Sequence, residues 1–141
     1  MNQFASLGHA EAQKAIEIIK TEMLKRGKAA VIAVADAHGE LIALLRVDGA
    51  PLTSIQIATN KAYTAAREHK ASRDIGQRSR DPEQGFDIAY YGDPKILGWG
   101  GGLPVVLEDV VVGAVGVSGL PEAEDIELAQ MGIDVILKMG K

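Results

Sequence analysis

The chain contains two pairs of short apolar runs, and within each pair only a few polar residues separate the two runs. Residues 31–35 and 41–45 flank the sequence Asp-Ala-His-Gly, and residues 103–107 and 110–117 flank Glu-Asp. Runs of this length around a tight polar turn are typical of β-hairpins. The sequence therefore predicts a sheet assembled from hairpins, which favours antiparallel over parallel pairing.

Three segments with apolar residues at helical spacing flank these hairpins. The first runs from Ser6 to Arg26, the second follows Pro51 with a stripe of mostly small residues, and the third begins at Pro121 with an acidic first turn. A further strand is expected over residues 96–99. The expected fold class is α/β (α+β), a mainly antiparallel sheet of about five strands layered with helices.

Composition narrows the possible functions. The 141 residues suit one domain spanning 1–141, and the chain has no cysteine, which excludes zinc fingers, iron–sulfur clusters and thiol nucleophiles. A net charge of -4 and 4% aromatic residues disfavour nucleic-acid and anionic-membrane partners. The N-terminus lacks the basic and apolar segments of a signal peptide, so we expect a cytoplasmic protein. A chain from which such a signal had been removed would look the same.

Three histidines are candidates for binding a metal or a haem iron. His38 lies in the first predicted turn, where a polar residue needs no functional explanation. His69 and His9 fall on the apolar faces of the second and first predicted helices, and we take them as possible haem-iron ligands. The alternative is that both are buried, hydrogen-bonded residues of the core. No two histidines stand four residues apart, so a dedicated transition-metal site is not expected.

Three charged residues form a second candidate site. Arg46 and Asp48 flank the turn after residues 41–45, and Lys61 lies at the edge of the apolar stripe of the second helix. Arg46 and Lys61 together are suited to hold a carboxylate. The alternative is that Arg46 pairs with Asp48 while Lys61 extends past the apolar face to solvent.

The glycine-rich segments match no nucleotide-binding or hydrolase motif. The triple glycine at 100–102 continues as Leu-Pro, whereas a phosphate-binding loop requires Lys followed by Ser or Thr. Ser118 lies in Gly-Val-Ser-Gly, which is not the frame of a nucleophile elbow. Gly113 and Gly116, inside a predicted strand, are expected to allow close packing in the sheet, or to form a wall against which a flat ligand lies.

Five segments carry a family resemblance. They are residues 34–39 (VADAHG), 46–50 (RVDGA), 60–66 (NKAYTAA), 100–105 (GGGLPV) and 112–119 (VGAVGVSG). In order and spacing they resemble the GlcG/HbpS-like proteins, a family that includes the C-terminal domain of the PduO corrinoid adenosyltransferase. The resemblance implies a profilin-like α/β/α fold and assembly into dimers, tetramers or octamers. It also implies haem as a cofactor, since some members bind haem and one branch is linked to haem degradation.

The ligand is expected in a cleft at the triple-glycine corner. The candidate ligand-binding residues are Arg46, Asp48, Lys61, Gly100, Gly101, Gly102 and Ser118. Where relatives continue Ser-Gly-Gly-Thr, this chain has Ser118-Gly119-Leu120-Pro121, and residues 75–99 differ from the connection usual in the family. Both departures border the expected cleft.

Three functions are compatible with the sequence. The first is a haem-binding or haem-handling accessory protein of a small-molecule catabolic system. The second is an enzyme, or an enzyme's partner, that acts on a small organic acid. The third is an assembly module without a ligand. Each is compatible with a homo-oligomer, and we expect Ile57 and Tyr63, on the outer side of the second helix, to contribute to a subunit contact.

Overall fold

A computed structural model describes residues 1–140 and contains one antiparallel sheet. The strands are β1 (Val31–Asp36), β2 (Leu41–Arg46), β3 (Gly102–Leu107) and β4 (Val110–Ser118), in the order β2-β1-β4-β3. The two hairpins are those that the apolar runs predict, and the long β4 pairs with β1 to join them. The mainly antiparallel sheet is therefore confirmed.

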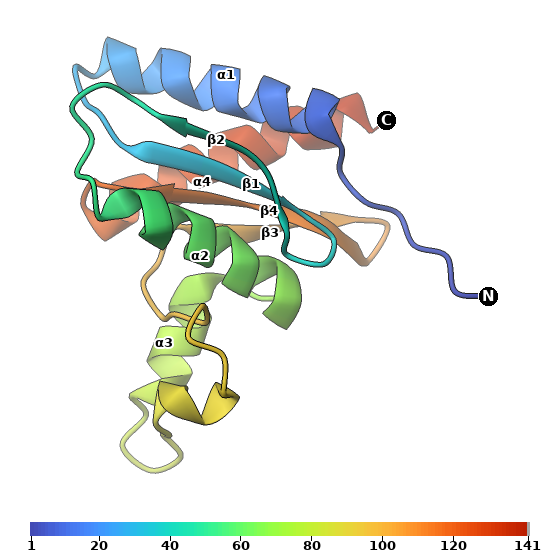
Figure 1. Cartoon of the computed structure of the whole chain (residues 1–141), viewed down its shortest axis with the longest axis vertical. Helices are drawn as coiled ribbons and strands as arrows, with labels where there is room; N and C mark the ends of the chain where they lie inside the picture. The colour runs from blue at the N-terminus through green and yellow to red at the C-terminus, as the bar shows by residue number, and fades with distance from the viewer. Residues whose placement is uncertain (141) are drawn as a thin grey trace.

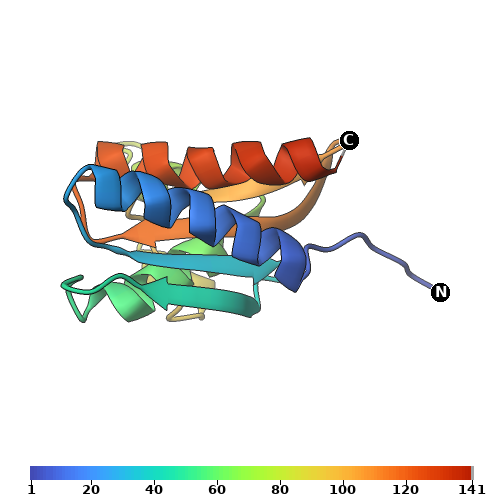
Figure 2. The same cartoon turned by 90° about the horizontal axis from the view of Figure 1, so that it is seen from above.

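Helices cover both faces of the sheet. α1 (His9–Lys25) and α4 (Glu122–Met139) lie side by side on one face, and α2 (Ser54–Glu68) lies on the other (Figures 1 and 2). This is the three-layer α/β/α arrangement that the resemblance implies. Within residues 1–140, no helix is both long enough and apolar enough to span a bilayer.

The two layers of the core differ in the size of their side chains. On the face of α1 and α4, branched residues such as Ile19, Ile32 and Ile136 fill the space. On the face of α2 the core is almost entirely alanine and valine, so the helix approaches the sheet closely. A Cβ on Gly116 of β4 would lie only 2.4 Å from the carbonyl oxygen of Ala58 in α2. The small-residue stripe predicted for α2 is thus confirmed as a close contact with the sheet.

The expected fifth strand over residues 96–99 is wrong, and the sheet has four strands. This segment packs against α3 (Ser72–Ser79), where a Cβ on Gly76 would lie 2.1 Å from the carbonyl oxygen of Gly98. The backbone N–H of Leu97 donates to the hydroxyl of Thr64 at 3.1 Å. The backbone of this segment is therefore engaged with helices instead of a neighbouring strand.

α3, the segment after it and the short 3-10 helix η1 (Ile88–Tyr91) form a projection beyond the end of α2 (Figure 1). Tyr63 of α2 is buried at its base, against Ile75 and Ile96. The expectation that Tyr63 faces a second subunit is wrong, because the projection already covers it.

Candidate functional site

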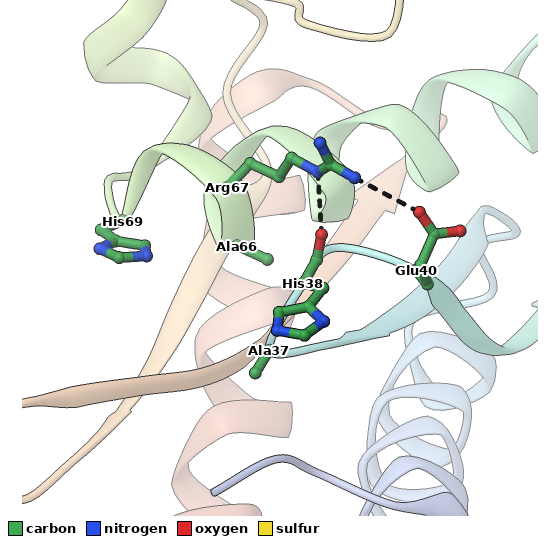
Figure 3. A pocket seen from close by; sticks show the side chains of 6 residues that line it. All are labelled: Ala37, His38, Glu40, Ala66, Arg67 and His69. Carbon is green, nitrogen blue, oxygen red and sulfur yellow. Dashed lines mark hydrogen bonds and ion pairs between the residues drawn. The ribbon is translucent and has the colours of Figure 1, made fainter. Parts of the chain in front are cut away.

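Two of the three histidines meet at one cleft. It has a volume of about 490 Å³ and lies between the β1–β2 turn and the C-terminal end of α2 (Figure 3). His38 comes from the turn and His69 from the end of the helix, and both are exposed. The full lining is Ala37, His38, Glu40, Ala66, Arg67 and His69.

The β1–β2 turn is held by its first residue. Oδ1 of Asp36 accepts the backbone N–H groups of His38 at 2.9 Å and Glu40 at 3.0 Å. Gly39 has a φ of +90°, and a Cβ there would lie 3.0 Å from Arg67 Cγ, so the turn needs glycine for its conformation and its packing. The hydrogen bonds of His38 use its backbone, while the ring of Phe4 packs on its imidazole with 4.3 Å between ring centroids.

His69 is not on the apolar face of α2, contrary to the prediction. The helix ends at Glu68, and His69 adopts the left-handed conformation at its C-cap, with a φ of 57°. A left-handed cap turns the chain out of the helical repeat, so spacing counted back to Ala62 no longer places the side chain in the core. The imidazole is exposed at the cleft instead (Figure 3).

Arg67 links the two sides of the cleft. Its Nε donates to the carbonyl oxygen of His38 at 2.9 Å, and a terminal nitrogen lies 3.5 Å from Oε1 of Glu40. Its guanidinium also lies over the ring of Tyr63, 4.6 Å from the centroid. The turn and the helix are therefore joined by a cation that is half-exposed in the cleft.

Below this cation, Tyr63 and Asp93 form a polar contact between α2 and the projection. The phenol of Tyr63 donates to a carboxylate oxygen of Asp93. This hydrogen bond lowers the pKa of Asp93 below its ordinary value, and it raises the pKa of Tyr63 because ionisation would break it.

His9 lies elsewhere. It is the first residue of α1 and is exposed, so its predicted place on the apolar face is wrong. The face that α1 buries begins with Ala12 and continues through Ala15 and Ile19. His9 is not among the residues that line the cleft of His38 and His69. Within residues 1–140, no group of three or more His, Asp or Glu side chains is arranged to hold a metal ion.

Lys61 is deeply buried, with 3% of its surface exposed, so the interpretation that it extends to solvent is wrong. Its ammonium donates to the carbonyl oxygen of Val117 at 2.8 Å and to Oδ2 of Asp125 at 3.2 Å. Burial lowers the pKa of Lys61 and raises that of Asp125, while their mutual attraction opposes both effects. The pair joins α2 to α4 beneath the triple glycine.

Arg46 and Asp48 line a different cleft of about 460 Å³, between the end of β2 and the end of α1. Lys61 is not part of that cleft, so the structure does not bring Arg46 and Lys61 together in one chain. Both Arg46 and Asp48 are exposed. Lys20 and Lys28 also line this cleft, beside the apolar side chain of Leu24.

The triple-glycine corner is packed tightly, which corrects the expectation of a cleft there. A Cβ on Gly102 would lie 2.2 Å from the carbonyl oxygen of Lys61, and one on Gly101 would lie 2.8 Å from Lys61 Nζ. A Cβ on Gly100 would lie 2.4 Å from Oε1 of Glu122. These glycines let the chain cross directly over Lys61. The hydroxyl of nearby Ser118 is buried and donates to the Ser54 hydroxyl at 3.2 Å.

Sequence reasoning missed two residues of the cleft of His38 and His69. The tight turn is a sufficient explanation for a polar residue at His38, and no motif in the sequence singles out Arg67. One available signal was the helix end itself: the chain continues as His-Lys-Ala-Ser after Glu68, and Ser72 then starts α3. The end of the helix at Glu68 places both Arg67 and His69 at an exposed end.

Comparison with known proteins identifies relatives along nearly the whole chain. The model of a family of haem degrading proteins, HbpS-like, matches residues 7–134. An uncharacterized 15.0 kDa protein from the dhaT-dhaS intergenic region of Citrobacter freundii is 33% identical over 132 residues, covering 94% of this chain and 93% of that protein. Protein GlcG of Escherichia coli K12 is 34% identical over 97 residues, 69% of either chain.

Solved structures have the same fold. Klebsiella pneumoniae protein ORFY superposes with a TM-score of 0.89 at 30% identity, covering 96% of this chain and 94% of that one. A double mutant of Streptomyces reticuli HbpS gives a TM-score of 0.84 at 28% identity, covering 96% of this chain and 90% of that one. The complex of PduOC with haem superposes with a TM-score of 0.84 at 22% identity, covering 92% of this chain and 94% of that one. At that identity the likeness shows the fold alone.

Proposed function

The chain belongs to the HbpS-like family of haem degrading proteins, and from that premise we propose that it binds haem or a related tetrapyrrole. The observation that carries this proposal is the meeting of His38, His69 and Arg67 around one cleft. We place the protein as an accessory component of a small-molecule catabolic system, as the resemblance to GlcG and PduO implies.

A haem site needs an accessible nitrogen for the iron, cations for the propionates and an apolar surface for the ring. The cleft offers the imidazoles of His69 and His38 for the first need and the guanidinium of Arg67 for the second. Its apolar wall within one chain is limited to the methyl groups of Ala37 and Ala66. These residues therefore fit the iron and the carboxylates of the ligand, while one side of the ring stays open.

Each side chain of the cleft has a distinct part in this proposal. His69 is our first candidate for the iron ligand because it is exposed at the C-cap of α2, where the left-handed conformation turns it out of the helix, and His38 is the second. Arg67 holds the turn to the helix and keeps part of its guanidinium available to a carboxylate. Bound haem would supply the redox chemistry of its iron, and the protein's share is to bind and orient it.

The experiment is titration of the apo protein with haemin while the Soret band is recorded. We expect a saturable shift that His69→Ala weakens most and His38→Ala weakens less. His9→Ala is the matched control, because it removes an exposed imidazole outside the cleft. If only His9→Ala loses the shift, the iron ligand lies on α1 and the cleft of His38 and His69 is not the haem site. If no saturable shift is seen at all, the proposal of haem binding is wrong.

The organic-acid alternative loses the arrangement on which it depended. It required Arg46 and Lys61 to hold one carboxylate, but Lys61 is buried against Asp125 and Arg46 lines a separate cleft. Within one chain, Arg46 would act without Lys61. The haem proposal is therefore the better supported of the two.

A further inference from the structure

Aromatic side chains are concentrated in the projection and in residues 92–99, which return from it to the sheet (Figure 1). The chain has six aromatic residues, and four of them lie between residues 86 and 99. Trp99, the largest of them, has 61% of its surface exposed. Apolar side chains gathered on an exposed surface and bordered by polar residues are typical of a binding site.

A cleft of about 510 Å³ lies between the end of α3 and the residues on either side of η1. Its volume is in the range of small-molecule sites, roughly 300–1,000 Å³. Among the described residues that line it there is no histidine, methionine or tyrosine, so it offers no usual ligand to a haem iron. Its apolar lining consists of Phe86, Ile88, Ile96, Leu97 and Trp99.

The backbone on both sides of this aromatic cleft is held in place. Gly76 of α3 and Gly98 are in direct contact, since a Cβ on Gly98 would lie 2.5 Å from Cα of Gly76. The N–H of Phe86 donates to the carbonyl oxygen of Ser79 at 3.0 Å, and the carbonyl oxygen of Trp99 accepts a serine hydroxyl of α3 at 2.6 Å. The two glycines also line the cleft and have no side chain to fill it, so the space between the fixed segments stays open.

Arg80, the C-cap of α3, supplies the positive charge of the aromatic cleft. Its side chain is exposed and forms no ion pair or hydrogen bond with any residue of the range 1–140. The one acidic side chain of the lining, Asp87, already accepts the N–H of Ala89 at 2.9 Å. The planar fork of N–H groups on a guanidinium matches the two oxygens of a carboxylate, so Arg80 is available to an anionic ligand.

Arg80 also lines a second cleft, of about 330 Å³, between α3 and the start of α4. Arg73 and Gln77 line it too, from the same face of α3. Nε of Arg73 lies 3.7 Å from Oε1 of Glu122, so that cation already has a carboxylate beside it. Arg80 therefore stands between an aromatic cleft and a polar one, and it is the cation there that a ligand can engage.

We propose that the aromatic cleft binds a flat aromatic carboxylate, with its ring against Phe86 and Trp99 and its carboxylate on Arg80. Burial of the ring against aromatic side chains and a charge-assisted hydrogen bond to the guanidinium both favour such a ligand. The site goes beyond the proposed function and does not depend on it, because it shares no residue with the cleft of His38 and His69.

Trp99 reports on this site directly. It is the only tryptophan of the chain, so its indole N–H gives a single cross-peak in a ¹H–¹⁵N NMR spectrum. We expect titration with naphthalene-2-carboxylate to move this peak until it saturates. The neutral 2-naphthylmethanol has the same rings and should bind several-fold more weakly, because it has no charge to meet Arg80. A peak that does not move, or equal affinities for the acid and the alcohol, would overturn the proposal.

Two matched variants test the role of the cation. Arg80→Gln should weaken the binding of naphthalene-2-carboxylate several-fold. Arg78→Gln is the control, because Arg78 is exposed on the same helix and lines neither cleft. Equal losses of affinity in the two variants would overturn the part assigned to Arg80.

A third variant separates this site from the proposed haem site. His69→Ala should leave the affinity for naphthalene-2-carboxylate unchanged. A loss of affinity there would place the acid in the cleft of His38 and His69 and overturn the aromatic cleft as its site. Haem binding is measured independently through the Soret band, so either proposal can fail while the other stands.

Discussion

The ammonium nitrogen of Lys61 lies 3.2 Å from Oδ2 of Asp125, and both side chains are at least 96% buried. The second oxygen of the carboxylate accepts the backbone N–H of Leu120 at 3.1 Å. A buried ion pair with its remaining groups satisfied is tolerated, but loss of one member leaves an uncompensated charge. This pair fixes α2, β4 and α4 together at the end of the sheet opposite the histidine cleft.

Lys61→Met should therefore lower the free energy of unfolding by about 3–5 kcal/mol, because Asp125 is left buried without a cation. Lys61→Met combined with Asp125→Leu should recover most of that loss. Lys28→Met is the matched control, since the side chain of Lys28 is 43% exposed and its partner Glu124 keeps a second cation, Arg26, so the change should cost less than about 1 kcal/mol. Urea unfolding measures all four proteins, and equal losses in the two single variants would contradict the structural role of Lys61.

Gly116→Ala should destabilise the protein by about 1–3 kcal/mol, because its Cβ would overlap the backbone of α2 at Ala58. Gly8→Ala provides the control. Its Cβ would have an ordinary contact of 3.6 Å with Glu11, so the loss should stay below about 1 kcal/mol. Thermal unfolding followed by circular dichroism compares the two, and a smaller loss at Gly116 would mean that α2 moves away easily.

The hairpins and the three main helices could be predicted because their signals are local. The period of the apolar residues and the residues of the tight turns are sufficient for these elements. The prediction of a strand over residues 96–99 fails for the opposite reason. Their backbone is engaged by Thr64 and Gly76, which are distant in the sequence, and an apolar run alone does not reveal such partners.

The candidate site was harder to predict than the fold for a related physical reason. Helical spacing places His69 correctly only if α2 continues through it, and the left-handed cap at that residue breaks the repeat. Lys61 showed the converse problem. A lysine at the edge of an apolar stripe normally reaches solvent, and only Asp125, 64 residues later, makes its burial possible.

Tyr63→Phe should raise the pKa of Asp93 toward its ordinary value, because the phenol that stabilises the ionised carboxylate is removed. A carboxylate whose pKa is lower in the folded than in the unfolded state adds stability above its unfolded pKa, and that stability is lost as the pH falls through the folded pKa. The wild type should therefore lose more stability than Tyr63→Phe on acidification below about pH 4. A ¹³C NMR titration of the Asp93 carboxyl measures the shift directly, and identical titration curves would show that the contact is absent in solution.

Arg67→Ala should weaken haem binding by roughly ten- to a hundredfold, because a charge-assisted hydrogen bond to a propionate contributes about 1.5–3 kcal/mol. The dimethyl ester of haem is the matched ligand, since it has the same ring and iron without the carboxylates. If Arg67 acts on a propionate, the ester should bind wild type and Arg67→Ala with similar affinity. If the variant loses affinity for both ligands alike, Arg67 acts by holding the turn of His38 against α2, through the 2.9 Å bond from its Nε to the carbonyl oxygen of that residue.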